Sequence, residues 1–136
     1  MTADPKEIYQ RYLWASALTR NADALAELFT EDGVLESPLV PAGHEYPRRL
    51  EGRDQIRAGM AAWYQRPAAD SEQEPDPGNS RYVLHPTTDP SVFITEIDAA
   101  LKGPAGTRTM SLVQIFRIRD GKIALMRDYF APEYVT

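Results

Sequence analysis

The sequence predicts a single α+β domain in which helices pack on one face of an antiparallel sheet. Helical patterns dominate the first half of the chain, and strand patterns fill most of the chain after Ser80, at residues 81–86, 91–102 and 108–130. Helices and strands that are segregated along a chain, rather than alternating, are typical of this class. The length of 136 residues fits one domain and is sufficient for a core that encloses a cavity.

A hairpin within residues 108–130 is the strongest local signal. Asp120 and Gly121 lie between two apolar segments, which is typical of a two-residue hairpin turn. Alternate side chains of a strand share a face. The faces so defined are Met110, Leu112, Gln114, Phe116 and Ile118, and Ala124, Met126, Asp128 and Phe130. Each face is apolar except for one residue, Gln114 or Asp128, and a carboxylate in such a face indicates either a wet surface or a pocket.

Two helices are predicted at the start of the chain. Asp4 with Pro5 is a good helix start, and the apolar pattern after them predicts a helix to about Thr19. Asn21 is expected to cap a second, shorter helix, which leads into a short strand at residues 34–37.

A third helix is expected to begin with Asp54 as its cap. Its apolar stripe is Ile56, Met60 and Trp63, at helical spacing. The proline-rich, acidic residues 66–80 come next, and they are long for a connection without secondary structure inside a compact domain. We interpret them as a mobile loop, with a lid or a disordered connection as the two alternatives.

The amino-acid composition argues against several classes of function and site. The chain has 15 basic and 20 acidic residues, a net charge of −5, which argues against a nucleic-acid partner. It has no cysteine, so disulfides, thiol catalysis and thiolate metal sites are excluded. Its two histidines do not allow a multi-histidine metal site, and no metal or cofactor is expected. Neither a signal peptide nor a membrane span is evident, so we expect a cytoplasmic protein without a membrane partner.

Three motifs, in this order of elements, resemble the SnoaL-like branch of the nuclear-transport-factor-like superfamily. They are LFTEDG at residues 28–33, EGRDQI at 51–56 and FRIRDGKI at 116–123. The resemblance covers essentially residues 1–136. It implies a cystatin-like cone, an α+β barrel in which a curved antiparallel sheet wraps around three helices and a deep apolar pocket. It also implies a homodimer.

The same resemblance assigns roles to individual residues. In SnoaL-like polyketide cyclases and phenazine-biosynthesis proteins an acid on the last strand transfers protons, and Asp128 matches its position. Tyr12 matches the tyrosine of the ketosteroid isomerase oxyanion hole, but Gln114 and Ser37 replace the two acids of that enzyme, so steroid isomerisation is not expected. Gly59 stands about where the phenazine proteins place a histidine, which argues against their chemistry.

The residue types themselves support these roles. In a pocket of low dielectric constant, desolvation should raise the pKa of Asp128 and make it a general acid or base. The alternative is a carboxylate paired with Arg108 or Arg127. Tyr12 either donates a hydrogen bond to a substrate oxygen or is a core tyrosine. Gln114 either orients a substrate carbonyl or is a structural amide.

His85 is a further acid–base candidate, although a structural histidine is the alternative. By strand alternation it shares a face with Val83. The expected substrate-binding residues are apolar and suit a flat or polycyclic ligand. They are Trp63, Leu112, Phe116, Met126 and Phe130.

These observations favour a cofactor-independent enzyme of secondary metabolism, in the lyase or isomerase class. We expect a cyclase, isomerase or dehydratase that acts on a carbonyl-bearing, apolar small molecule. The alternative is a non-catalytic module of the same fold that binds a ligand or dimerises. A third option, an epoxide hydrolase, requires an Asp–Arg–Asp arrangement, and Arg127 is expected on the face opposite Asp128.

Overall fold

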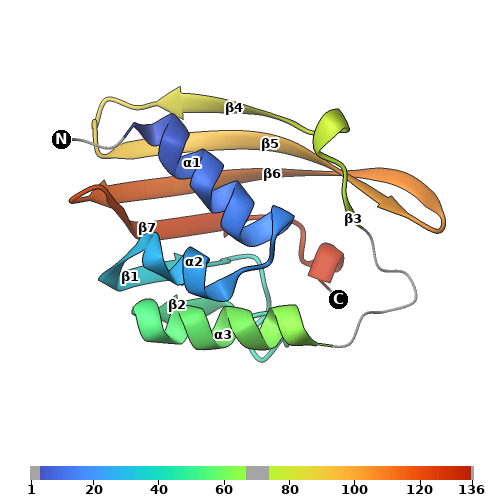
Figure 1. The fold of residues 1–136 in the computed structure, drawn as a ribbon, viewed down its shortest axis with the longest axis horizontal. Helices are drawn as coiled ribbons and strands as arrows, with labels where there is room; N and C mark the ends of the chain where they lie inside the picture. The colour runs from blue at the N-terminus through green and yellow to red at the C-terminus, as the bar shows by residue number, and fades with distance from the viewer. Residues whose placement is uncertain (1–3, 67–73, 136) are drawn as a thin grey trace.

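The computed structural model of the protein describes residues 4–66 and 74–135. Within these residues three α-helices lie on one face of a curved sheet of seven strands, which confirms the predicted α+β class (Figure 1). The sheet does not close, so the expected barrel is an open, curved wall. No helix in the described part of the chain is both long and apolar enough to span a membrane.

The helical segments begin close to where the sequence predicts. Asp4 and Asn21 cap their helices by accepting backbone N–H groups, as expected. The cap of the third helix is Gly52, and Asp54 lies in the first turn instead. The predicted first helix changes to a π-helical turn at Trp14, and Ser16 Oγ of this turn donates to the Tyr12 carbonyl of the preceding α-helical turn (2.7 Å). The segments are α1 (Pro5–Leu13), η1 (Trp14–Leu18), α2 (Ala22–Glu27) and α3 (Arg53–Gln65).

The strands form a mixed sheet. They are β1 (Phe29–Glu36), β2 (Arg49–Glu51), β3 (Glu74–Pro75), β4 (Arg81–Pro86), β5 (Val92–Gly103), β6 (Gly106–Arg119) and β7 (Lys122–Tyr129). Their order is β2-β1-β7-β6-β5-β3, with β4 also paired to β5. The described pairings are antiparallel except β1 with β7, which is parallel because the meander of β5, β6 and β7 returns beside β1 in the same direction.

Part of the predicted loop at residues 66–80 is folded. Residues 67–73 lie outside the described residues. Strand β3 pairs with β5, and a 3₁₀ turn, η2 (Pro77–Asn79), comes after it. Asp76 is buried beside this turn, and its backbone N–H donates to the Ala100 carbonyl (2.8 Å). Backbone pairing therefore anchors the end of this segment to the sheet.

The hairpin of β6 and β7 forms as predicted, with one irregularity. Asp120 and Gly121 both have positive φ, which is the geometry of a tight two-residue turn. Arg117 pairs with Leu125 and Ile118 with Ile123, so Ala124 is an extra residue in β7. This bulge moves Ile123, rather than the predicted Ala124, to the buried face.

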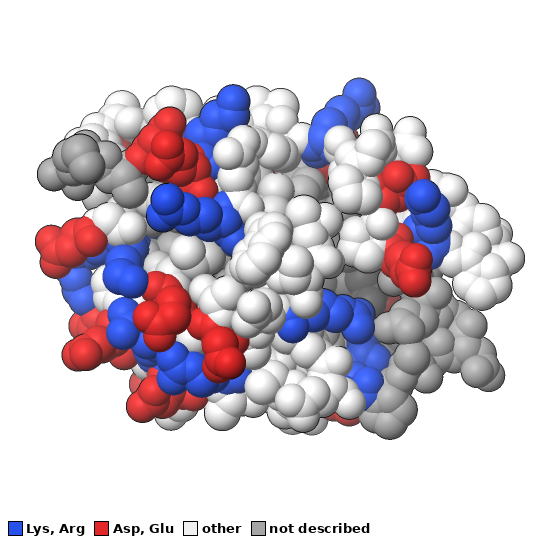
Figure 2. Space-filling model, viewed as in Figure 1, with Lys and Arg blue, Asp and Glu red and all other residues white. Residues whose placement is uncertain are grey.

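The inner face of the sheet carries two apolar clusters. The larger lies beneath α1 and α2 and includes Tyr9, Phe93 and Phe116. The smaller consists of Val40, Leu112 and Phe130, with Tyr46, Ile97 and Met110 packed against it. The outer surface of α2 and α3 shows interleaved acidic and basic side chains, where Arg57 contacts Asp23, Glu27 and Asp54 (Figure 2).

Candidate active site

Strands β6 and β7 place Gln114 and Asp128 directly opposite each other on the inner face of the sheet. Both side chains are buried, with exposed fractions of 3% and 8%. Gln114 Nε2 donates to Asp128 Oδ1 at 3.3 Å. The pair lies between the two apolar clusters, since Phe116 is the next inward residue after Gln114 on one side and Phe130 after Asp128 on the other. The sequence prediction that these two residues share one face is confirmed.

Two further residues fix the amide of Gln114. The Tyr9 hydroxyl donates to Gln114 Oε1 at 2.6 Å, and the Thr95 hydroxyl donates to the same oxygen at 3.1 Å. The amide nitrogen is thereby turned toward the Tyr12 hydroxyl, at 3.4 Å, as well as toward Asp128. The sequence did not predict Tyr9 and Thr95 as site residues. The pattern that could have indicated them is their position: Tyr9 lies about one helical turn before Tyr12, and Thr95 lies on the buried face of β5.

Burial raises the pKa of Asp128 to about 7, and the hydrogen bond from Gln114 opposes the rise. Both protonation states are therefore accessible near neutral pH, as a general acid or base requires. The alternative of an ion pair with Arg127 does not hold. Arg127 lies on the exposed face of β7, where its Nε donates to Glu36 Oε1 at 3.3 Å.

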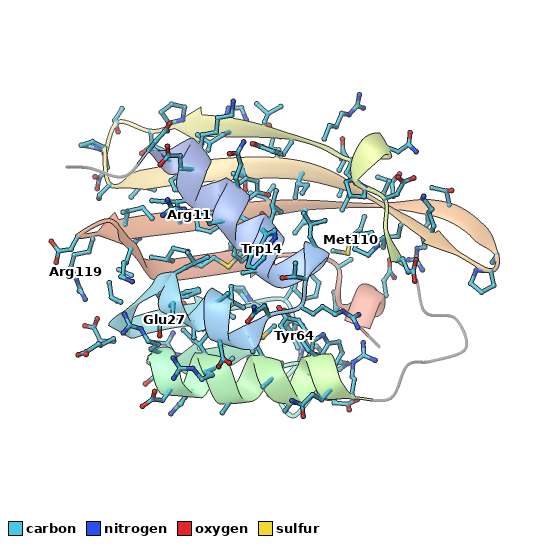
Figure 3. All side chains as sticks on the ribbon, in the orientation of Figure 1. Arg11, Trp14, Glu27, Tyr64, Met110 and Arg119 are labelled. Atoms are coloured by element: carbon cyan, nitrogen blue, oxygen red, sulfur yellow. The ribbon has the colours of Figure 1, made fainter. Side chains whose placement is uncertain are left out.

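The charge of Asp128 acts on three tyrosines, Tyr12, Tyr46 and Tyr64. Burial, and then the charge of Asp128, raises the pKa of both Tyr12 and Tyr46. Burial also raises the pKa of Tyr64 to about 12, although Arg20 opposes this change. Tyr64 extends from α3 toward the sheet (Figure 3). All three hydroxyls therefore stay protonated near neutral pH.

The predicted lining residues fall into two groups. Phe116 and Met126 are fully buried in the main core, where Phe116 stacks on Phe93 with ring centroids 4.7 Å apart. Trp63 and Phe130 instead form an aromatic wall with Tyr46 between them. The Tyr46 ring centroid lies 4.8 Å from that of Trp63 and 5.4 Å from that of Phe130.

Leu112 joins this second group through its contact cluster with Phe130. The guanidinium of Arg66 stacks over Trp63, 3.7 Å from the ring centroid, at the far end of the wall. The wall therefore runs from the neighbourhood of Asp128 to the end of α3.

The structure does not bring His85 to this cluster. It is exposed on β4, where its Nε2 lies 2.6 Å from Glu96 Oε2. Tyr82, on the opposite face of β4, contacts Tyr9 instead. His85 and Asp128 are thus on different faces of the sheet, as strand alternation requires. His44 acts locally, since its Nδ1 accepts the backbone N–H of Tyr46 at 2.9 Å.

Two hollows on the described surface are not lined by Asp128. One, of about 560 Å³, lies beside the β6–β7 turn, near Asp32, Arg119 and Lys122. The other, of about 260 Å³, lies along the exposed side of α1 near Arg11 and Trp14 (Figure 3). Because Asp128 is only 8% exposed, a ligand that contacts it has to displace some of the side chains around it. Among residues 4–66 and 74–135 no three His, Asp or Glu side chains are grouped to hold a metal ion.

Comparison with known proteins finds a family for most of the chain. Residues 9–126 match the model of the SnoaL-like domain. The chain is also 31% identical over 122 residues to an uncharacterised PhzA/B-like protein of Pseudomonas aeruginosa, a match that covers 85% of this chain and 77% of the relative.

Solved structures show the same fold at lower identity. A candidate isomerase of Bacillus subtilis has a TM-score of 0.74 at 20% identity, covering 96% of this chain and 88% of that one. A candidate polyketide cyclase of Pseudomonas putida has a TM-score of 0.63 at 21% identity, covering 95% and 91%. These likenesses confirm the fold that the motifs indicate.

Proposed function

Because the chain belongs to the SnoaL-like domain family, we propose that it is an enzyme that relocates a proton on a carbonyl-bearing, largely apolar small molecule. The reaction is an isomerisation, cyclisation or dehydration, in the setting of secondary metabolism. The observation that carries the proposal is a buried carboxyl group, Asp128, whose pKa is about 7 and which faces hydrogen-bond donors. The family hosts many reactions, so the site rather than the fold decides the chemistry.

The side chains of the proposed site are sufficient for an isomerisation. The carboxylate of Asp128 takes a proton from the carbon beside the substrate carbonyl, and the electron pair of that C–H bond moves toward the carbonyl oxygen. An enolate forms, and Asp128 returns the proton to another carbon of the conjugated system. No redox step or cofactor enters this reaction.

Tyr12 is the donor that we assign to the developing oxyanion. Gln114 Nε2 donates to the Tyr12 oxygen at 3.4 Å, so this contact does not use the hydroxyl proton of Tyr12. Among the described residues, no hydrogen bond gives that proton an acceptor. A substrate oxygen placed there receives a hydrogen bond that strengthens as negative charge builds up.

The aromatic wall supplies the apolar part of the binding site. Tyr46 lies edge-on to both Trp63 and Phe130. A flat ring system packed against these side chains would place its carbonyl end near Asp128. Tyr46 comes from the loop between β1 and β2, so this loop is the element that we expect to move when a ligand enters.

A non-catalytic binding module of the same fold is the second candidate. It is favoured by the close packing around Asp128, whose side chain is 8% exposed and lines neither hollow of the described surface. In that case Asp128 anchors a ligand through hydrogen bonds without transferring its proton.

Hydrogen–deuterium exchange separates the two candidates. The protein is incubated in D₂O with a panel of cyclic enones and β-keto compounds, and deuterium at carbon is followed by NMR. The wild type should catalyse exchange, and Asp128→Asn should lower the rate by about 100-fold or more. The matched control is His85→Gln, on the other face, which should exchange like the wild type.

Ligand binding is measured on the same panel by calorimetry. Binding without exchange by the wild type would favour the binding module. Full exchange activity in a folded Asp128→Asn protein would refute the role of Asp128.

A further inference from the structure

We propose that Tyr9 and Thr95 are positioning residues that hold the amide of Gln114 with its NH₂ group against Asp128, and that this orientation favours the carboxylate form of Asp128, the form that acts as a base, before substrate binds. The inference rests on the proposed function, because it assumes that Asp128 moves the proton. It also specifies the first step of the proposed reaction: a site with its base ionised begins by removing a proton from the substrate.

The contacts of Gln114 fix the two ends of its amide. The Tyr9 oxygen lies 2.6 Å from Gln114 Oε1, a separation typical of O–H···O rather than N–H···O hydrogen bonds. Thr95 Oγ1 reaches the same oxygen at 3.1 Å. Tyr9 and Thr95 are both fully buried, and a buried hydroxyl that gives up this partner loses a hydrogen bond. Two donors on Oε1 therefore leave Nε2 for Asp128 and Tyr12.

The orientation matters because the two ends of an amide favour opposite charge states of a neighbouring carboxyl group. An N–H donor stabilises the carboxylate, whereas a carbonyl oxygen accepts a hydrogen bond from the protonated carboxyl group and so stabilises the neutral acid. The charge of Asp128 also acts on Tyr12, Tyr46 and Tyr64, which come from α1, the β1–β2 loop and α3, and in addition to burial it raises the pKa of each. Gln114 Nε2 is the donor with a hydrogen bond to Asp128 among the described residues, so the orientation of this amide bears directly on which form of the carboxyl group is favoured.

The network spans distant parts of the chain. Tyr9 is 105 residues from Gln114 and comes from α1, and Thr95 is 19 residues away on the neighbouring strand β5. Packing of α1 on the sheet thus sets the charge state of a residue on β7. Neither Tyr9 nor Thr95 is assigned a contact with the substrate, so both act through Gln114.

The test is the titration of Asp128 itself, measured without substrate by NMR of the ¹³C-labelled aspartate carboxyl groups. Tyr9→Phe and Thr95→Val each remove one donor while keeping the shape of the side chain. Each should increase the proton-binding constant of Asp128 by about tenfold, since one pKa unit is a tenfold change. Thr95→Ser keeps the hydroxyl and should titrate like the wild type. Tyr82→Phe, which removes a hydroxyl from the ring beside Tyr9, is the matched control.

The variant Gln114→Leu distinguishes action through the amide from a general change in polarity. Asp128 should have a higher proton affinity in Gln114→Leu than in the wild type. The double variant Gln114→Leu/Tyr9→Phe should then have the same proton affinity at Asp128 as Gln114→Leu alone. The proposal is overturned if Tyr9→Phe and Thr95→Val leave the titration unchanged, or if Tyr9→Phe acts equally without Gln114. Because the titration needs no turnover, this result is independent of whether Asp128→Asn abolishes exchange.

Discussion

Gln114 Nε2 lies 3.3 Å from Asp128 Oδ1, yet the hydrogen bond does not restore the ordinary pKa of this carboxyl group. Burial raises it from 3.8 to about 7, and Gln114 offsets only part of the effect. Inside the fold the ionised form is thus less stable than in the unfolded chain. The stability of the protein and the proposed chemistry place opposite demands on this position.

The first prediction concerns stability against pH. The folded pKa of Asp128 lies above the unfolded one, so the contribution of this group is fully present below about pH 4 and is lost as pH rises through 7. Asp128→Asn removes that loss. The variant should match the wild type at pH 4 and exceed it at pH 8 by a few kcal/mol, with about 4 kcal/mol as the ceiling.

Urea unfolding of both proteins at pH 4 and pH 8 checks this. An equal gain at both pH values would mean that the substitution acts through packing and not through ionisation. A loss of stability at pH 8 would contradict the raised pKa.

The second prediction concerns Tyr12. Removing its hydroxyl takes away the donor that we assign to the substrate oxygen, so Tyr12→Phe should lower the exchange rate by roughly 100-fold while substrate binding changes little. Folding should be affected by only about 1 kcal/mol, since Gln114 Nε2 keeps Asp128 as a partner. Exchange rates measured over a range of substrate concentrations separate the effect on the rate from the effect on binding, and Tyr82→Phe is the control. An unchanged rate in Tyr12→Phe would remove Tyr12 from the mechanism.

The third prediction concerns the contact between β1 and β7, the strand that carries Asp128. A Cβ atom on Gly33 would lie 3.0 Å from both the Ile123 carbonyl oxygen and Phe29 Cβ, which is too close for either to remain in place. Gly33→Ala should therefore destabilise the protein by about 1–3 kcal/mol. Gly78→Ala is the matched control, because its Cβ would have 3.8 Å to the nearest atom, Asp76 Oδ1. Thermal unfolding compares the two, and equal melting temperatures would contradict the crowding.

Local sequence pattern was sufficient for the core of the site. Strand alternation around the Asp120 turn set Gln114 and Asp128 each in an apolar face and put Arg127 on the opposite face, and the family resemblance turned both apolar faces toward the interior. It was not sufficient for the bulge at Ala124, which shifts the buried position to Ile123. A bulge depends on how two strands pair, and periodicity within one strand does not reveal it.

The hydrogen-bond partners of Gln114 could not be predicted from local sequence pattern, for a related reason. Tyr9 reaches it from α1, and whether Tyr9 or Tyr12 points at the amide depends on how the helix rests on the sheet. The parallel pairing of β1 with β7 is likewise a property of strand order and not of either strand alone. The sequence correctly predicted that His85 shares a face with Val83. His85 is remote from Asp128 because the helices cover the other face of the sheet, and strand alternation alone does not show which face they cover.

The last prediction concerns self-association, which the family resemblance leads us to propose. Val83, Glu96 and Val113 are paired in a row across β4, β5 and β6 on the face away from the helices. Val83 is 55% and Val113 39% exposed, so this row presents apolar surface to solvent. Covering it with a second copy would remove that surface from water. Val113→Lys would place a charge in such an interface and should convert a dimer to a monomer.

Analytical ultracentrifugation over a range of concentrations measures this. The matched control is Leu39→Lys, at a residue that is 52% exposed on the loop after β1 and is not part of the row of Val83, Glu96 and Val113. A wild type that dimerises, with Val113→Lys monomeric and Leu39→Lys still dimeric, places the interface on the strands. If Val113→Lys has the same mass as a dimeric wild type, the outer face is not the interface, and a monomeric wild type contradicts the proposed dimer itself.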